Sequence, residues 1–276
     1  LPLSMGAPST MPINVGSIMN KGVEVSLYGN IINTSKVHWT WNLNMSHYKN
    51  TILELDESVS EKGIRGSNYI YKIGGSLYDA YMYKYAGVDP ENGQALYWTH
   101  NDETGEDTTT PVFSDATRYE LGTVMPKLYG GFGTSLSAYG FDFSAQASFQ
   151  LGGKFYDGGY QSLMWTQKSA GSAWHKDALK AWTPENPNTD VPRMDGDTQV
   201  AQSAVDRFLI SSNYISLNNV TLGYTFPKSL LNKIKVAGLR VYIAGENLGV
   251  FCARKGIDPR FSMGLGSYTS GSGIGT

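Results

Sequence analysis

The sequence predicts an all-β fold of antiparallel strands, each with one apolar and one polar face. The stretch 141–151, "FDFSAQASFQL", has an apolar residue at every odd position and a polar residue at every even one. The stretch 37–46, "VHWTWNLNMS", repeats this alternation. The composition agrees, because 32 Gly, 18 Tyr, 10 Phe and 6 Trp are typical of a turn-rich, aromatic β protein. A period of two over this length indicates strands rather than helices.

The predicted strands form four hairpins, about eight strands in all. In the second hairpin, Pro90 presets a tight turn and Gly93 can take a positive φ. In the fourth, the link after Pro227 has room for one helical turn. The paired segments are, in chain order, 22–32 with 37–46, 76–87 with 94–100, 127–138 with 141–151, and 213–226 with 239–248.

The connections between these hairpins are of a different kind from the turns inside them. They are long and rich in Gly, Ser, Thr, Asn, Asp and Pro, and they cover 50–75, 101–126 and 156–206. In an up-and-down meander, this alternation puts all short turns at one end and all long loops at the other. Outer-membrane β-barrels have this asymmetry.

A soluble β-sandwich also has alternating strands, so it is the main structural alternative. Two observations favour a transmembrane antiparallel β-barrel instead. Aromatic residues gather near the predicted strand ends, where barrels place their interfacial girdles. Eleven residues at about 3.3 Å each also reach roughly 36 Å, which is enough for a tilted crossing of the hydrocarbon layer.

The barrel interpretation assigns each face of the two clearest strands. We expect five residues to face lipid: Phe141, Phe143, Phe149, Trp39 and Trp41. We expect five residues to face a water-filled lumen: Asp142, Ser144, Gln146, Ser148 and Gln150.

Several classes of function find no support in the sequence. A net charge of −2 gives no electrostatic reason to expect nucleic acid binding. Cys252 is the only cysteine, so no intrachain disulfide or cysteine-based metal cage is expected. The four histidines are scattered, and the acidic stretch 100–107 lacks the spacing of a calcium-binding EF-hand loop. No catalytic motif is recognisable, so we expect neither an enzyme, nor a cofactor, nor a metal site.

One helix is predicted inside the longest loop, over 172–182. Ser172 can cap it, Trp174 and Trp182 recur on one face, and Pro184 follows its end. Its two tryptophans would either pack against the rim of the barrel or contact a ligand or partner protein.

Six long phrases together span most of residues 14–260. They are "NVGSIMNKGVEVSLYGNII" (14–32), "GGSLYDAYMYKYAGVDPENGQAL" (74–96), "MPKLYGGFGTSLSAYGFDFSAQASFQLGGKFYD" (125–157), "HKDALKAWTPENPNTDVPRM" (175–194), "DRFLISSNYISLNNVTLGYTFPKSLL" (206–231) and "LRVYIAGENL" (239–248). In this order they resemble one family, the SusC-like TonB-dependent transporters (RagA/SusC type) of Bacteroidetes outer membranes.

The resemblance implies a barrel of roughly 22 strands with a plugged lumen. Residues 1–276 would be a C-terminal part of that barrel, because neither a plug domain nor a TonB box is recognisable, and "GSYTSGSGIGT" does not resemble a final strand. The start, "LPLSMGAPST", has the character of an internal position rather than of a leader.

The function implied by the resemblance is active uptake across the outer membrane. Such a transporter imports oligosaccharides or oligopeptides, is covered by a SusD-like surface lipoprotein, and draws energy from TonB through its plug. Candidate contacts to the substrate or the lipoprotein lie in the longest loop: Trp165, His175, Asp177, Trp182 and Asn186. The alternatives are a passive or adhesive outer-membrane barrel, and a soluble glycan-binding β-protein with Phe141, Phe143 and Phe149 in its core.

Overall fold

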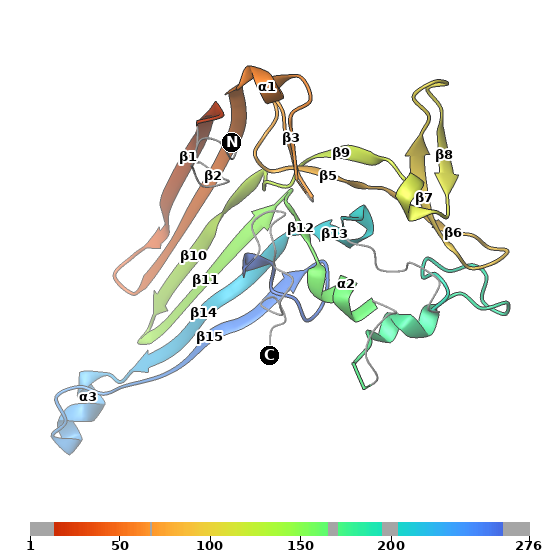
Figure 1. Ribbon diagram of the computed structural model, residues 1–276. Helices are drawn as coiled ribbons and strands as arrows, with labels where there is room; N and C mark the ends of the chain where they lie inside the picture. Colours follow the sequence, from red (N-terminus) through yellow and green to blue (C-terminus); the bar gives the residue numbers. More distant parts are fainter. Residues whose placement is uncertain (1–13, 67, 165–170, 195–203, 262–276) are drawn as a thin grey trace, which may run out of the picture.

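A computed structural model describes residues 14–66, 68–164, 171–194 and 204–261 of the chain. Its largest part is a six-stranded antiparallel sheet (Figure 1). The six strands lie side by side in the order in which they occur along the chain. The strands, in sheet order, are β1 (Gly16–Asn33), β2 (Val37–Leu55), β10 (Leu128–Ala138), β11 (Phe141–Leu151), β14 (Tyr214–Thr225) and β15 (Arg240–Cys252). The predicted β-rich antiparallel fold is confirmed.

The register of the sheet gives it two chemically different faces. Paired residues of antiparallel strands project to the same face, so a row can be followed across all six strands. One row is apolar throughout: Ile32, Trp39, Leu136, Phe143, Leu222 and Ile243. A row on the opposite face is almost entirely polar: Asn30, Thr40, Ser135, Ser144, Thr221 and Ala244. The alternation predicted for single strands therefore extends over the whole sheet.

All short links of the sheet lie at one end. Tyr139 and Gly140 join β10 to β11 with φ values of 53° and 92°, as a two-residue type I′ turn requires. Residues 34–36 join β1 to β2, and 226–239 join β14 to β15 through α3 (Lys228–Leu231) and η5 (Asn232–Ile234). The long connections, 56–127 and 152–213, lie at the other end (Figure 1). The predicted separation of turns from long loops holds for three of the four predicted hairpins, whereas the turn of the second hairpin lies within the connection 56–127.

The second predicted hairpin does not join the large sheet, so the expected count of about eight sheet strands is wrong for the described residues. Its turn exists, because β6 (Tyr85–Val88) pairs with β7 (Ala95–His100). These two strands form a separate sheet with β8 (Asp107–Thr110), while β5 (Asp79–Tyr83) pairs with β9 (Arg118–Thr123). Ala80 and Met82, and Ala95 and Tyr97, alternate along their strands because they are buried against the other connections.

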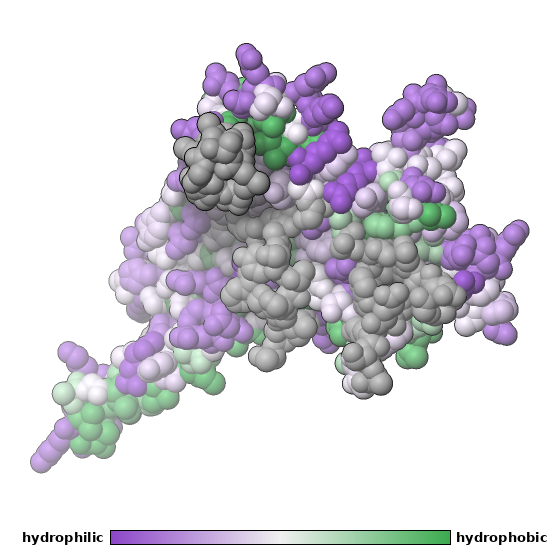
Figure 2. Space-filling view, in the orientation of Figure 1, coloured by the Kyte–Doolittle hydropathy of each residue, from purple (hydrophilic) through white to green (hydrophobic). Residues whose placement is uncertain are grey.

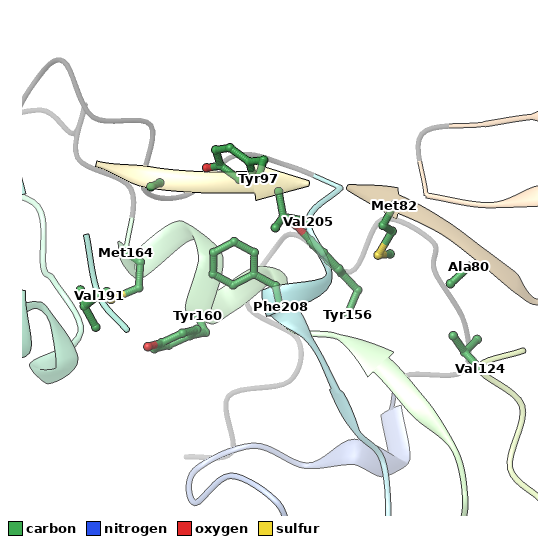
Figure 3. Close-up of a cluster of buried hydrophobic side chains, with 11 residues drawn as sticks. Ala80, Met82, Tyr97, Val124, Tyr156, Tyr160, Met164, Val191, Val205 and Phe208 are labelled. Carbon is green, nitrogen blue, oxygen red and sulfur yellow. The ribbon is translucent and has the colours of Figure 1, made fainter. Parts of the chain in front are cut away.

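The long connections fold together around a compact apolar core, which we call the loop core (Figure 3). It consists of Ala80, Met82, Ala95, Tyr97, Val124, Tyr156, Tyr160, Met164, Val191, Val205 and Phe208. Tyr97 and Phe208 are each 1% exposed. Burying one large apolar side chain contributes about 1.5–3 kcal/mol, so this core stabilises the packing of the two connections against each other. The two long connections therefore form a packed layer, which we call the loop layer.

The remaining short elements belong to this loop layer. They are α1 (Glu57–Ser60), β3 (Ile64–Arg65), β4 (Ile70–Tyr71), η2 (Phe113–Asp115), β12 (Lys154–Tyr156), α2 (Gly158–Met164), η3 (Lys176–Lys180), η4 (Asp206–Phe208), β13 (Leu209–Ser211) and η6 (Pro259–Phe261). In the described part of the chain, no helix has the length and apolar character needed to span a membrane. Nor does any group of three His, Cys, Asp or Glu side chains in these residues form a potential metal site.

The helix predicted over 172–182 is wrong in length and in type. The structure has a short 3₁₀ helix there, η3, capped by His175 rather than by Ser172. The backbone of His175 is extended, with ψ of 145°, and its ring accepts a hydrogen bond from Asp177 N. The helix ends at Lys180, and Trp182 beyond it donates from Nε1–H to Pro90 O at 3.1 Å. Contacts with other segments override the local helical pattern.

Candidate functional site

The five residues predicted to face the lumen all lie on the polar face of the sheet. Asp142, Ser144, Gln146, Ser148 and Gln150 alternate along β11 with the apolar row, and their partners on β10 include Ser137, Ser135 and Gly133. The five residues predicted to face lipid all lie on the opposite face, since Trp39 is in register with Leu136 and Leu136 with Phe143. The two predicted sets are thus separated by the sheet itself.

Near the loop end of the polar face, half-buried tyrosines from three strands line a cavity of about 450 Å³, which we call the tyrosine hollow. The rings are Tyr48 on β2, Tyr129 on β10 and Tyr214 on β14. Tyr48 and Tyr129 meet edge to face, with centroids 6.0 Å apart. The full lining is Asn44, Tyr48, Pro126, Tyr129, Gly130, Gln150, Tyr214 and Arg260, together with Phe149, whose position in the register of β11 belongs to the apolar face.

Polar groups at the hollow are held in place by hydrogen bonds. Gln150 donates from Nε2 to Ser212 Oγ at 2.7 Å, which fixes the orientation of its amide. Arg260 donates from Nη1 to Ser216 Oγ at 3.1 Å and from Nε to Asp258 Oδ1 at 2.8 Å. The bonds from Arg260 lower the pKa of Asp258, so this carboxylate stays charged. The hollow combines aromatic faces with an amide and a guanidinium group, which together can bind a polar oligomer without covalent chemistry.

Two of the five loop candidates lie together. Asp177 N donates to His175 Nδ1 at 3.1 Å, and Tyr160 donates from its hydroxyl to Asp177 Oδ2 at 3.1 Å. Lys180 Nζ lies 2.9 Å from Asp177 Oδ1, and this bond is the main reason why the pKa of Asp177 is lowered. We call these four residues, with Asp157 and Arg254, the rim cluster.

The rim cluster connects α2 to the segment that follows β15. The Arg254 guanidinium lies 3.6 Å above the centre of the Tyr160 ring, and its Nε lies 3.2 Å from Asp157 Oδ2. Asp157 also accepts from Tyr160 N through Oδ1 at 2.8 Å, at the start of α2. Burial raises the pKa of Asp157, and the Tyr160 N–H and the Arg254 charge oppose that shift. The cluster therefore ties the connection 152–213 to the segment that follows the last strand of the sheet.

The other loop candidates lie elsewhere. Trp182 packs against Gly93, where a Cβ atom would approach the indole ring to 2.5 Å. Asn186 donates from Nδ2 to Lys180 O at 3.2 Å, a bond within its own loop. Trp165 lies outside the described residues. Among the four described candidates, the structure thus brings His175 and Asp177 together.

The sequence analysis names Gln150 and Phe149 of this lining, but it does not single out the three tyrosines or Arg260. Tyr129 shares its parity with Ser135 and Ser137 on β10, and this parity alone places it on the polar face. Arg260 has no such signal, because it reaches the sheet only through the fold of the segment after β15.

Comparison with curated proteins identifies relatives along nearly the whole chain. The chain is 29% identical over 268 residues to TonB-dependent receptor P3 of Formosa agariphila. The aligned region covers 89% of this chain and 25% of that protein. It is 24% identical over 277 residues to TonB-dependent receptor SusC of Bacteroides thetaiotaomicron, with 96% of this chain and 26% of that protein covered. The chain is a homologue of the SusC-like TonB-dependent receptors. No family model matches it.

Solved structures agree with this SusC-like relationship. The structure of the RagAB peptide transporter superposes with a TM-score of 0.78 at 27% identity, over 96% of this chain and 29% of that one. The RagAB peptide importer in its open-open state gives a TM-score of 0.75 at 26% identity, over 96% of this chain and 28% of that one. The resemblance predicted from the sequence is confirmed, and the chain spans about a quarter of the length of the curated SusC-like relatives it matches.

Proposed function

We propose that this chain forms part of the wall of an outer-membrane barrel that imports nutrient oligomers with energy from TonB. The observation that carries the proposal is the uncovered apolar face of the sheet. Ile243 and Phe251 are each 72% exposed there, and Phe141 is 57% exposed. A continuous apolar face of this extent is unfavourable in water, whereas the hydrocarbon of a membrane covers it without cost.

In this proposal, residues 1–276 are a C-terminal part of the transmembrane domain, and the plug and the final strand lie in the rest of the polypeptide. The edges of β1 and β15 that point away from the sheet have no partner strand among the described residues. Unpaired backbone groups are costly in lipid, so further strands must close the barrel. Phe141, Phe143, Phe149, Trp39 and Trp41 then face lipid, and Asp142, Ser144, Gln146, Ser148 and Gln150 face the lumen.

The substrate in this proposal is an oligosaccharide or oligopeptide that passes along the polar face. The tyrosine hollow lies at the loop end of that face, where an incoming substrate arrives first. Its rings offer stacking surfaces, and Gln150 and Arg260 offer hydrogen bonds. The similarity to a peptide transporter supports an oligopeptide, while the stacking surfaces are equally suited to sugar rings.

The proposed partner at the loop end is a SusD-like lipoprotein that covers the barrel. The loop core makes this end a preorganised surface, which lowers the entropy cost of docking a lid. His175, Asp177, Trp182 and Asn186 belong to the same loop layer and remain our candidates for contacts with the lid or the substrate, together with Trp165.

The test is to purify the full-length protein from its native membrane in mild detergent and to identify what accompanies it by mass spectrometry. We expect a stoichiometric surface lipoprotein, peptides of a plug domain, and a bound oligomer. A protein that purifies alone and contains no plug would instead be a passive or adhesive barrel.

A further inference from the structure

The link between β14 and β15 extends beyond the level at which the neighbouring turn ends. Thr225 N donates to Gly140 O at 2.7 Å, so the end of β14 is level with the two-residue turn of β10 and β11. Residues 226–239 continue past that level and carry α3 at their far end (Figure 1). Because two residues suffice to connect β10 to β11, the length of this link is not required by the sheet. We call residues 226–239 the turn-end tip.

The turn-end tip has a defined fold. Pro227 precedes α3, and Leu230 N donates to Pro227 O at 3.0 Å. Lys235 takes a left-handed conformation with φ of 56°, and Val236 N then donates back to Leu231 O at 3.1 Å. Leu231 is only 3% exposed. The exposure of the other side chains therefore follows from a stable local structure.

The surface of the turn-end tip is both apolar and basic. Leu230, Ile234 and Val236 are 53%, 63% and 38% exposed. Lys228, Lys233 and Lys235 are exposed beside them, and no acidic residue occurs in 226–239. Figure 2 shows the hydrophobic colour gathered over this tip with hydrophilic side chains at its margin. This combination is typical of segments that lie in the interface of a membrane.

We propose that the turn-end tip is a membrane-surface anchor that binds the headgroups of anionic phospholipids through Lys228, Lys233 and Lys235. Leu230 and Ile234 enter the boundary between headgroups and acyl chains. The tip carries three positive charges and no negative ones, which is complementary to such a surface. It is also continuous with the apolar face, because Leu239 and Val241, 42% and 57% exposed, lead directly into it. This anchor rests on the membrane placement argued under Proposed function.

The anchor is tested on the full-length protein in lipid nanodiscs, with nitroxide labels introduced singly at Ile234, Phe143 and Lys62. Accessibility to oxygen and to a water-soluble nickel complex reports the depth of each label. In nanodiscs that contain phosphatidylglycerol, we expect the Ile234 label at headgroup depth, the Phe143 label in hydrocarbon and the Lys62 label in water. An Ile234 label in water beside a Phe143 label in hydrocarbon overturns the anchor alone. A Phe143 label in water overturns the membrane placement and the anchor together.

The lysines are tested by a triple variant, Lys228→Gln, Lys233→Gln and Lys235→Gln. Native mass spectrometry measures the phosphatidylglycerol that stays bound. We expect retention to fall by tenfold or more, since each lysine near an anionic surface contributes roughly fivefold to binding. The matched control replaces Lys62, Lys176 and Lys255, which are exposed at the loop end, by Gln and leaves retention unchanged. An equal loss in both variants overturns the proposal, as does an Ile234 label whose depth is the same in purely zwitterionic lipid.

Discussion

Asp142 of β11 and Arg240 of β15 form a bidentate ion pair across the strand that separates them. Oδ2 lies 2.5 Å from Nη2, and Oδ1 lies 3.1 Å from Nε. The pair passes over Gly223 of β14, where a Cβ atom would lie 2.6 Å from Asp142 Oδ2 and 2.7 Å from Arg240 Nη2. The glycine is therefore the residue that permits three strands to be linked on the polar face.

This relationship predicts that Gly223→Ala displaces the ion pair and lowers the unfolding temperature of the purified barrel. Heat-dependent mobility in gel electrophoresis measures that temperature. In an Asp142→Ala, Arg240→Ala background the clash is removed, so the same Gly223→Ala substitution should have a much smaller effect. Equal effects in both backgrounds would show that Gly223 serves another purpose.

A lysine at Phe143 should impair assembly in the outer membrane. A basic residue on the lipid face near the bilayer midplane costs about 2–4 kcal/mol. Gln146→Lys is the matched control, because Gln146 lies on the polar face of the same strand. The yield of heat-modifiable protein in isolated outer membranes measures both variants. A similar loss for the two would contradict the assignment of faces.

The tyrosine hollow predicts a substrate-binding effect for Tyr129→Ala and Tyr214→Ala. Loss of one stacking ring should weaken binding by about threefold to tenfold, since such contacts contribute about 0.5–1.5 kcal/mol each. Calorimetric titration of the full-length protein with its co-purified oligomer measures this change. Tyr28→Ala is the control, because Tyr28 is on the same face but 68% exposed and outside the hollow. Binding that Tyr28→Ala weakens as much as Tyr129→Ala would argue against the hollow.

The loop core predicts that Phe208→Ala loosens the loops and leaves the sheet in the membrane. Removing this ring, which is 1% exposed, should destabilise the loop layer by about 3–5 kcal/mol. Limited proteolysis of intact cells should then cleave the long connections faster, at unchanged barrel yield. The control is Val112→Ala, at a side chain that is 50% exposed. The long connections of this variant should be cleaved at the wild-type rate. Loss of the barrel itself would mean that the loops are needed for assembly.

The raised pKa of Asp157 predicts that the stability of the rim cluster depends on pH. Burial raises its pKa above the ordinary value of 3.8, so the folded loop binds a proton more tightly than the unfolded loop. Its contribution to stability is therefore greatest below pH 3.8 and is lost as the pH rises through the raised pKa. Asp157→Asn should flatten the pH profile of loop proteolysis in the range above the ordinary pKa of 3.8, and Asp115→Asn, at an exposed residue, should not. A profile that Asp157→Asn leaves unchanged would exclude this carboxyl as the cause.

The orientation of the chain predicts opposite labelling of two engineered cysteines in a Cys252→Ser background. A thiol at Lys176, in the loop layer, should react with an impermeant reagent on intact cells. A thiol at Lys233, in the turn-end tip, should react only after the outer membrane is permeabilised. The reverse pattern would invert the topology.

The sequence alone determined the features that depend on neighbours in the chain. The alternation of Phe141 to Leu151 defines two faces because the side-chain period of a strand is two, whatever lies beside it. The turn at Tyr139 and Gly140 follows from its position between two such strands, and the grouping of short turns at one end follows from strand order. The family resemblance is also local information, because it rests on long uninterrupted phrases.

The tertiary structure decided which segments meet. The alternation of apolar and polar residues does not show whether Met82 and Tyr97 belong to the large sheet, because a strand buried in the loop layer alternates in the same way. The loop core joins residues from Ala80 to Phe208, and the tyrosine hollow joins Tyr48, Tyr129, Tyr214 and Arg260 from four separate segments. Contacts over such separations depend on the packing of the whole chain. For that reason the two faces of the wall could be predicted from the sequence, whereas the hollow in one of them became visible only in the folded protein.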